Sequence, residues 1–361
     1  MPDALQQLLQ WSTQQTAAAQ SAASSTSTAV TVKPEASPET SASTSTAAAP
    51  APQQKLDTAI LDHIMGKSEA VMMRDKLAIM VDPEQDLNER IMAMDDFEML
   101  IESIDNAADM QNMNMWPKVL GLLTDKQDPI IKLACWICGT AIQNNPKAQE
   151  AFHRHKPMAK LYSLISSIHP TISSTQISNS TRAKAVYCLS AALKHWPGAV
   201  ADLTDDSNRG WSTLREGLSD PDPVIRRKIA FLINTLLIQS TDMPEDSTQS
   251  STPAAVGQPN EMVEKMSETR VVDALLKSLT KPLPMGADGD ISEPDWDLRE
   301  KCTRALVSAL ERGGLDAEQR QSLASLWDSW KMDDEWENVG FTPSEAEQAK
   351  KLLRGDRAMS S

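Results

Sequence analysis

The sequence predicts an all-α protein, built as an armadillo- or HEAT-like α-solenoid with a disordered N-terminal arm. Three observations predict this fold: a composition rich in Leu, Ala, Met, Lys and Glu, helical spacing of apolar residues from about residue 56 to 332, and internal repetition. The Val, Ile and Thr alternation that is typical of strands is scarce. Because a repeat array grows without one central core, 361 residues are compatible with a single elongated array.

The arm has two parts. Residues 1–12 form a short amphipathic segment with Leu8, Leu9 and Trp11 at helical spacing, too small to be stable alone. Residues 13–54 consist mainly of Ser, Thr, Ala, Gln and Pro, which cannot bury enough apolar surface to offset the entropy of ordering the chain. We therefore expect a disordered tether between the segment and the helices.

Residues 55–115 are expected to form N-terminal capping helices, and residues 116–312 the armadillo-like repeats. Four long helices beginning near residues 131, 182, 226 and 299 carry the same apolar stripe at i, i+4 and i+8. A shorter helix precedes each one, so the expected unit is a short helix, a turn and a long helix. Asp and Pro in DKQDP and SDPDP are predicted to cap two long helices. Residues 240–260 predict a surface loop, and residues 313–361 a C-terminal cap and acidic tail.

Charge and hydropathy argue against two classes of partner. The net charge of -15 and the pI of about 4.8 leave no clustered basic footprint for nucleic acid. The longest apolar run, IAFLINTLLI at 229–238, is about half the length that spans a bilayer, so it predicts a buried helix and no membrane insertion. The N-terminus lacks the basic and apolar regions of a secretory signal, and a cytoplasmic location is expected.

The cysteines and histidines do not form a convincing site. Cys135 and Cys138 make a C-x-x-C within a helical pattern, without the strand-to-helix turn of a redox site or the second pair of a zinc site, which favours burial in the core. Cys188 and Cys302 also lie in helical patterns. His153 and His155 have no partner at ligand spacing, so solvated side chains at a helix end are expected.

Motifs for other chemistry are incomplete. The segment DGDISEPDWDLR supplies Asp288, Asp290 and Ser292 but has Glu293 in place of the turn glycine and Arg299 in place of the closing Glu of a calcium loop. Phosphate-binding and hydrolase motifs are missing from the sequence. Methionines between residues 65 and 115, Met92 and Met99 among them, favour gap-filling in the core over an adaptable surface. We therefore expect no enzyme activity, no cofactor and no metal.

Several long segments resemble one family. They are DPEQDLNERIMAMDDFEMLIESIDNAADM, MWPKVLGLL, GTAIQNNPKAQEAF and TRAKAVYCLSAAL, with LLQWS near the N-terminus. In order, they closely resemble the fungal Fes-type exchange factors, relatives of the human heat-shock-70-binding protein, over residues 56–240 and more loosely to 312. The resemblance implies a monomeric armadillo body whose concave face embraces lobe II of the nucleotide-binding domain of a cytosolic heat-shock-70 chaperone. It implies faster ADP release, in support of protein folding and client release, without a cofactor.

The resemblance also implies where the chaperone is contacted. One set of contacts is at the IDNA turn, and the other at the basic start of the third long helix; they are Asp105, Asn106, Ala107, Arg226, Arg227 and Lys228. Structural roles are the alternative, because Asn106 can cap a helix, Ala107 can satisfy a tight turn, and the stem of Arg226 can cover a neighbouring helix. In the arm, Leu8, Leu9 and Trp11 are implied to engage the chaperone's substrate-binding domain as a peptide would.

A different class of function, an armadillo adaptor that holds an extended cargo peptide, makes a different demand on the sequence. Such adaptors of the importin or catenin type use a ladder of Asn on the inner helices. The corresponding column here contains only one Asn; it is Gly139, Ser190, Asn234 and Val307. The adaptor therefore remains the alternative to the exchange factor.

Overall fold

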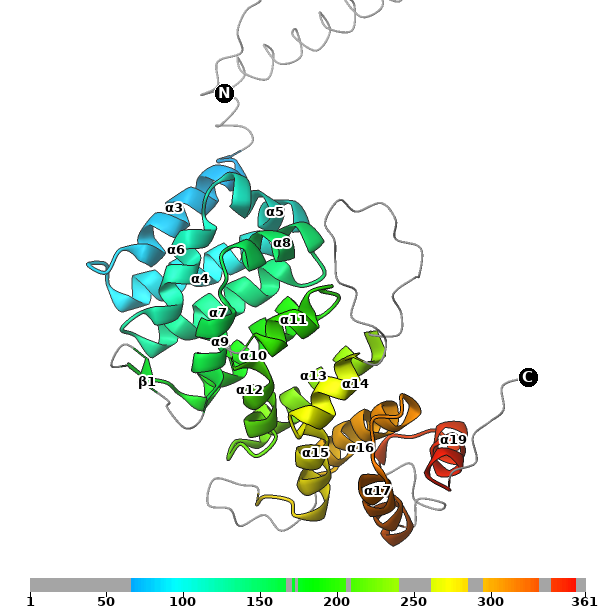
Figure 1. The fold of residues 1–361 in the computed structure, drawn as a ribbon. Coiled ribbons are helices and arrows are strands. Elements are labelled where there is room, and N and C mark those ends of the chain that lie inside the picture. Colours follow the sequence, from blue (N-terminus) through cyan, green and yellow to red (C-terminus); the bar gives the residue numbers. More distant parts are fainter. Residues whose placement is uncertain are drawn as a thin grey trace, which may run out of the picture. The chain divides into compact units, whose positions relative to one another are not determined.

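The computed structural model describes residues 66–166, 171–172, 175–205, 209–239, 261–284, 295–330 and 339–354. The chain divides into two compact units, residues 1–68 and 69–361, and every element below lies in the second. The predictions for residues 1–12, 13–54 and 240–260 fall outside the described residues. Figure 1 shows the second unit as helices that follow one another in chain order.

The described residues confirm the all-α class, with one small hairpin as the exception. In the hairpin β1 (Thr171–Ile172) pairs antiparallel with β2 (Thr175–Gln176), placing Thr171 opposite Gln176. The hairpin leads into a long helix, and Thr175 donates its hydroxyl to the carbonyl of Asp125 at 3.2 Å. It therefore attaches the connection before that helix to the preceding repeat.

The helices fall into three sets that repeat in order along the chain. The first helices of the repeats are short: α5 (Ile104–Asn112), α8 (Pro146–Arg154), α11 (Ala199–Thr204) and α14 (Glu261–Glu268). The second helices are α6 (Trp116–Gly121) with the 3-10 helix η1 (Leu122–Thr124), α9 (Met158–Ile165), α12 (Gly210–Gly217) and α15 (Val271–Thr280). The third, long helices are α7 (Asp128–Ile142), α10 (Asn179–Leu193), α13 (Pro223–Gln239) and α16 (Trp296–Glu311).

This arrangement corrects the predicted unit of two helices to a unit of three. The long helices and the shorter helices before them lie where the sequence predicts. The first helices were missed, and α5 places the start of the first repeat at Ile104, within the region expected to hold only capping helices. Before it come α3 (Glu69–Val81) and α4 (Leu87–Ile101), and after the last repeat come α17 (Ala317–Ser329) and α19 (Pro343–Arg354).

The long helices pack in series and form one layer of the unit. Helix α4 packs on α7, α7 on α10, α10 on α13, and α13 on α16. The second helices cover the other side of this layer, as α9 does for α10 and α15 for α16. One continuous core of Leu, Ile, Ala, Met and Cys side chains runs through these contacts. Each repeat therefore completes its core only against its neighbours, as in other solenoids.

Local signals explain where the long helices begin. Asp222 accepts a hydrogen bond from the backbone N–H of Val224 at 2.8 Å, which confirms the predicted cap in SDPDP. The predicted cap in DKQDP is wrong, because Gln127 is the N-cap residue of α7 and makes no side-chain capping bond. Asp128 lies in the first turn of α7 and accepts from the N–H of Ser178 at 3.0 Å. Its carboxylate therefore joins two repeats.

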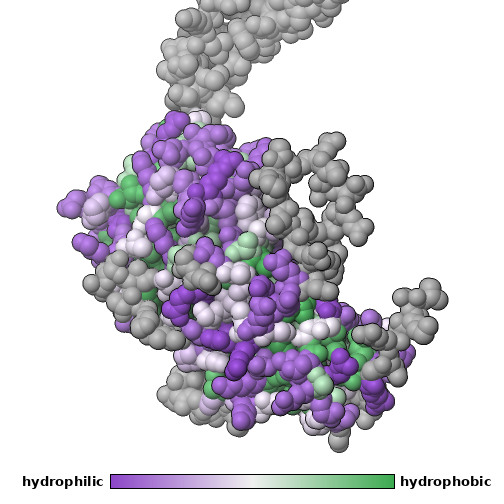
Figure 2. All heavy atoms as spheres, in the orientation of Figure 1, coloured by the Kyte–Doolittle hydropathy of each residue, from purple (hydrophilic) through white to green (hydrophobic). Residues whose placement is uncertain are grey.

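The surface is mainly polar. On the face drawn in Figure 2, hydrophilic side chains predominate and hydrophobic ones are scattered among them. The large apolar side chains that remain exposed include Met92 and Met99 on α4 and Phe231 on α13. Met92 and Met99 are 66% and 69% exposed, so the expectation that they fill gaps in the core is wrong. Other methionines of the described N-terminal region, such as Met73 and Met94, are fully buried and do fill the core. In the described part of the chain, no helix is long and apolar enough to cross a membrane.

Candidate functional site

The three predicted contact residues in the IDNA turn have different environments at the start of α5. Asp105 is exposed and lies in the first turn of the helix. Asn106 donates its amide to the carbonyl of Leu100 at 2.8 Å and to Glu69 Oε2 at 2.7 Å. Asn106 therefore caps the carbonyl end of α4 and links it to α3, which is the structural role considered for this residue.

Ala107 packs in the core. Its side chain is only 2% exposed and belongs to the continuous hydrophobic core. This burial supports the packing role considered for Ala107, and a direct contact with the chaperone stays a prediction. Of the three predicted contact residues in the IDNA turn, only Asp105 is classed as exposed; Ile104, the first residue of the turn, is also 65% exposed.

The RRK segment, like the IDNA turn, combines a buried residue with others that reach the surface. Arg226 is 1% exposed and donates from Nη1 to the carbonyls of Asp220 at 2.8 Å and Pro221 at 3.2 Å. Burial lowers the pKa of this guanidinium, although the nearby carboxylates of Asp295 and Asp220 oppose the shift. Arg226 therefore fixes the turn before α13, which supports the structural role considered for it, and its implied contact with a chaperone stays a prediction.

Arg227 and Lys228 reach the surface. Arg227 is about one-third exposed and donates from Nε to both carboxylate oxygens of Asp295, at 2.9 and 3.0 Å. Lys228 is exposed on the next position of α13. Arg227 therefore joins α13 to the start of α16, whereas Lys228 is exposed to solvent.

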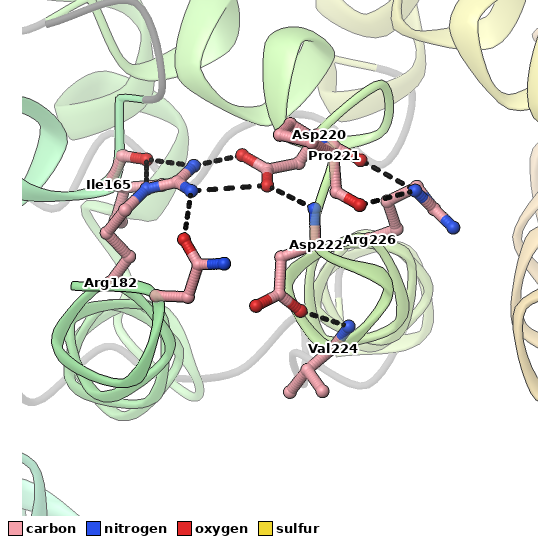
Figure 3. Close-up of polar contacts among 8 residues, drawn as sticks. Ile165, Arg182, Asp220, Pro221, Asp222, Val224 and Arg226 are labelled. Atoms are coloured by element: carbon pink, nitrogen blue, oxygen red, sulfur yellow. Dashed lines mark hydrogen bonds and ion pairs between the residues drawn. The ribbon is translucent and has the colours of Figure 1, made fainter. Parts of the chain in front are cut away.

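The turn that precedes α13 holds a buried ion pair. Arg182 Nη2 pairs with Asp220 Oδ2, and the side chains of Arg182 and Asp220 are 3% and 2% exposed. Arg182 also donates from Nε to the carbonyl of Ile165 at 3.1 Å, at the end of α9. Figure 3 shows the Arg182 guanidinium between Ile165 and Asp220, with Arg226 approaching the same turn from the other side. The start of α13, and with it Lys228, is therefore positioned by buried charges.

A groove of about 560 Å³ opens beside these residues, along α10, α13 and the start of α16. Arg227 and Lys228 line it, so the RRK segment contributes two of its three residues to one cavity. Its other walls include Tyr187 and Lys194 of α10 and Phe231 of α13. The groove therefore combines cations with aromatic rings on the layer of long helices.

Sequence reasoning missed an aromatic column on this layer. One aromatic residue occupies the equivalent position of each of the helices α7, α10 and α13: Trp136, Tyr187 and Phe231. Each follows by two residues a member of the aligned apolar column Ala134, Ala185 and Ile229. Lys184 Nζ lies 3.7 Å from the centroid of the Trp136 ring and 5.7 Å from that of Tyr187. The overlay of the long helices already contained this signal, because all three aromatics fall in one column.

The structure does not place the two predicted clusters in one repeat. The IDNA turn belongs to the first repeat, and RRK belongs to the third. The arm residues Leu8, Leu9 and Trp11 lie outside the described residues. The single Asn of the expected peptide ladder, Asn234, accepts a hydrogen bond from Ser308 at 3.1 Å and so binds its neighbouring helix.

The cysteines are core residues, as predicted. All four are buried thiols without disulfides. Burial raises the pKa of Cys135 and Cys188 well above the ordinary value and that of Cys302 to about 12. Because the thiolate is the reactive form, these side chains are poor nucleophiles.

His153 corrects the expectation of two solvated histidines. Its ring stacks on Trp196 with centroids 4.1 Å apart, Nδ1 lies 3.2 Å from Asp202 Oδ2, and Nε2 lies 2.9 Å from the carbonyl of Ala192. His155 is exposed. Within the residues that the structure describes, His, Cys, Asp and Glu side chains form no group of three that could hold a metal ion.

Comparison with known proteins relates the chain to one family. The family model described as "Nucleotide exchange factor Fes1" matches residues 5–110, a range that includes the LLQWS segment and the IDNA turn. The chain is 38% identical over 281 residues to the Hsp70 nucleotide exchange factor FES1 of Cryptococcus neoformans, covering 76% of this chain and 72% of that protein. It is 35% identical over 291 residues to FES1 of Mycosarcoma maydis, covering 70% of this chain and 72% of the relative.

Solved structures agree with the fold. A designed armadillo repeat protein superposes with a TM-score of 0.55 at 15% identity, over 78% of this chain and 99% of the designed protein. At that identity the likeness supports the armadillo fold alone. The curated relatives, which the chain matches over 72% of their length, show that the chain belongs to the Fes1 family of Hsp70 nucleotide exchange factors.

Proposed function

We propose that this protein is a nucleotide exchange factor that binds lobe II of the nucleotide-binding domain of a cytosolic Hsp70 and accelerates release of ADP. The observation that carries the proposal is the 38% identity to an Hsp70 nucleotide exchange factor across the repeats described above. The surface we assign to the chaperone includes Asp105 on α5 and Arg227 and Lys228 on α13. By accelerating exchange, this protein would support client folding and client release by the chaperone. We propose that it acts as a monomer in the cytoplasm.

Exchange of this kind needs no catalytic side chain. If the array binds the open, nucleotide-free chaperone more tightly than the closed, ADP-bound one, linkage requires ADP to bind the complex more weakly. Weakening ADP binding tenfold takes about 1.4 kcal/mol of differential binding, which is a small part of what a standard protein interface supplies. The role of the array is therefore to distinguish two states of its partner.

The arm extends this proposal. Leu8, Leu9 and Trp11 form the apolar edge of a segment that the family match includes. Short apolar peptides suit a chaperone's substrate-binding groove, so we assign the arm a role in releasing client. Deleting residues 1–12 should leave ADP release unchanged and slow the displacement of a bound client peptide. Slower ADP release from the deletion would contradict this division of roles.

The test of the central proposal is stopped-flow release of a fluorescent ADP analogue from a cytosolic Hsp70, with and without this protein. We expect clear acceleration by the wild-type chain. Asp105→Arg should reduce the acceleration, because Asp105 is exposed on the assigned surface. The control is Asp328→Arg, which makes the same charge change at an exposed position of α17 and should leave the acceleration unchanged. Binding without any acceleration would favour the peptide-binding adaptor and refute the exchange factor.

A further inference from the structure

The groove along α10 and α13 carries a charge opposite to that of the whole chain. The protein has a net charge of -15, yet the groove is lined by Lys194, Arg227, Lys228 and Lys301, against the single carboxylate of Asp297. Asp297 itself pairs with Lys301 and lies 3.7 Å from Arg227. Within the described residues, Lys194 and Lys228 form no ion pair. Two cations of the groove are thus left for an external anion.

A further lysine extends the positive charge beyond the groove. Lys184 lies over the Trp136 ring, one turn from Tyr187. Partial burial lowers the pKa of Lys184, and the charges of Lys228 and Lys132 lower it further, although Glu98 opposes them. Lys184, Lys228 and Lys132 thus add positive charge to this part of the long-helix layer, with Glu98 as a nearby carboxylate. Positive fields of this kind attract acidic partners and repel basic ones.

Apolar side chains accompany the cations. Val224 and Phe231 line the groove with 43% and 52% of their surface exposed. They lie seven residues apart on α13, which places them on one face two turns apart. The ring of Tyr187 lines the opposite wall, held by a hydrogen bond from its hydroxyl to Gln143 Oε1 at 2.8 Å. Exposed aromatic rings in a concave, partly enclosed site are typical of the residues that dominate binding energy.

We propose that this groove is the anchor point for an acidic patch on the chaperone's nucleotide-binding domain. An apolar side chain of the partner inserts between Tyr187 and Phe231, and carboxylates beside it pair with Lys228 and Lys194. This inference rests on the proposed function, and it goes further by naming the groove and the charge of the surface that fits it. The argument from complementarity is that both unpaired lysines border one apolar slot on an otherwise acidic protein.

Charge reversal in the groove should weaken binding mainly through association. Lys228→Glu should raise the dissociation constant for the isolated nucleotide-binding domain at least about tenfold and should flatten its dependence on salt. Lys228→Arg keeps the charge and should bind within about twofold of wild type. The matched control is Lys147→Glu, which makes the same charge change on exposed α8, outside the groove.

Removing the apolar anchor should act through dissociation. Phe231→Ala should also weaken binding about tenfold or more, with an unchanged salt dependence, because hot-spot aromatics chiefly set the dissociation rate. Val71→Ala, an exposed apolar residue on α3, is the control. Because Lys228 and Phe231 are both exposed, their variants should melt within a few degrees of wild type by circular dichroism.

The measurements separate failure of this inference from failure of the proposed function. Surface plasmon resonance at low and at physiological salt gives the two rates, and the exchange assay runs in parallel. Wild-type binding and exchange that persist unchanged in Lys228→Glu and Phe231→Ala would overturn the anchor but leave the exchange factor standing. A wild-type chain that neither binds nor accelerates exchange would overturn both. If sedimentation shows a dimer that Phe231→Ala dissociates, the groove receives a second copy and the inference is wrong.

Discussion

The buried pair Arg182–Asp220 makes the strongest prediction about stability. Replacing Asp220 with Ala leaves the Arg182 guanidinium 3% exposed with its carboxylate removed, and it deprives the backbone N–H of Asp222 of an acceptor 2.9 Å away. Breaking a buried pair from one side typically costs about 3–5 kcal/mol, because the remaining charge is buried without compensation. The carbonyl of Ile165 still accepts from Arg182, so we expect the lower part of that range, about 3 kcal/mol.

Urea unfolding followed by circular dichroism measures this loss. Glu150→Ala is the control, because Glu150 pairs with Arg154 on α8 with both side chains about 60% exposed, and it should cost less than about 0.5 kcal/mol. Hydrogen exchange should show faster exchange at the N–H of Asp222 in the Asp220 variant. A loss below about 1 kcal/mol, or unchanged protection at Asp222, would refute the reasoning that this pair positions the turn.

Three further predictions concern other parts of the unit. Gln149→Leu should cost about 2 kcal/mol in urea unfolding, because its buried amide donates to three carbonyls at the end of α10, and an unchanged midpoint would contradict this. Ala107→Arg should lower the melting temperature, since a core position 2% exposed would receive a charge; a melting curve that matches wild type would show that the side chain escapes to the surface. Burial raises the pKa of Cys302 from 9.0 in the unfolded chain to about 12 in the folded one. Its contribution to the free energy of unfolding is therefore fully present below about pH 9 and is lost as the pH rises towards 12. Rapid labelling of native Cys302 at pH 8, without denaturant, would contradict its burial.

The sequence predicts the long helices well because each has at least two apolar turns in a common stripe. It fails for the first helices, which are only six to nine residues long. A helix of that length has too few turns to establish a period, and its stability comes from packing. The break after each long helix was still detectable: Asn144 and His195 both take positive φ, 54° and 57°, at equivalent positions. Asn and His are both enriched in that conformation among residues other than Gly, so each position carries a weak sequence signal.

The structure separates the predicted contact residues into buried and exposed ones, for a physical reason. The resemblance assigns whole segments, such as IDNA and RRK, but neighbouring residues of a helix point in different directions. Ala107 and Arg226 therefore enter the core beside the exposed Asp105 and Lys228. Burial of a long basic side chain cannot be recognised from its type, because Arg is mostly exposed in proteins unless it is paired. The groove was missed because its residues come from three helices that only the fold brings together.

The aligned arginines show the same limit and explain how the groove keeps its form. Sequence alignment of the long helices places Arg182, Arg226 and Arg299 in one column, yet each binds differently. Arg182 pairs with Asp220, and Arg226 binds backbone carbonyls of the same turn. The guanidinium of Arg299 lies 4.5 and 4.6 Å from the ring centroids of two tryptophans.

The clearest repeat of the Arg182 arrangement comes from α4, outside the aligned column. Arg90 donates to the carbonyl of Met80, at the end of α3, and pairs with Asp125 in the turn before α7 at 2.7 Å. Arg182 does the same between the end of α9 and the turn before α13. In both places a buried arginine thus spans from the end of one helix to the turn before a later long helix. Because the spacing between α10 and α13 determines how far apart Tyr187 and Phe231 lie, weakening the Arg182 clamp should change the groove without altering any residue that lines it.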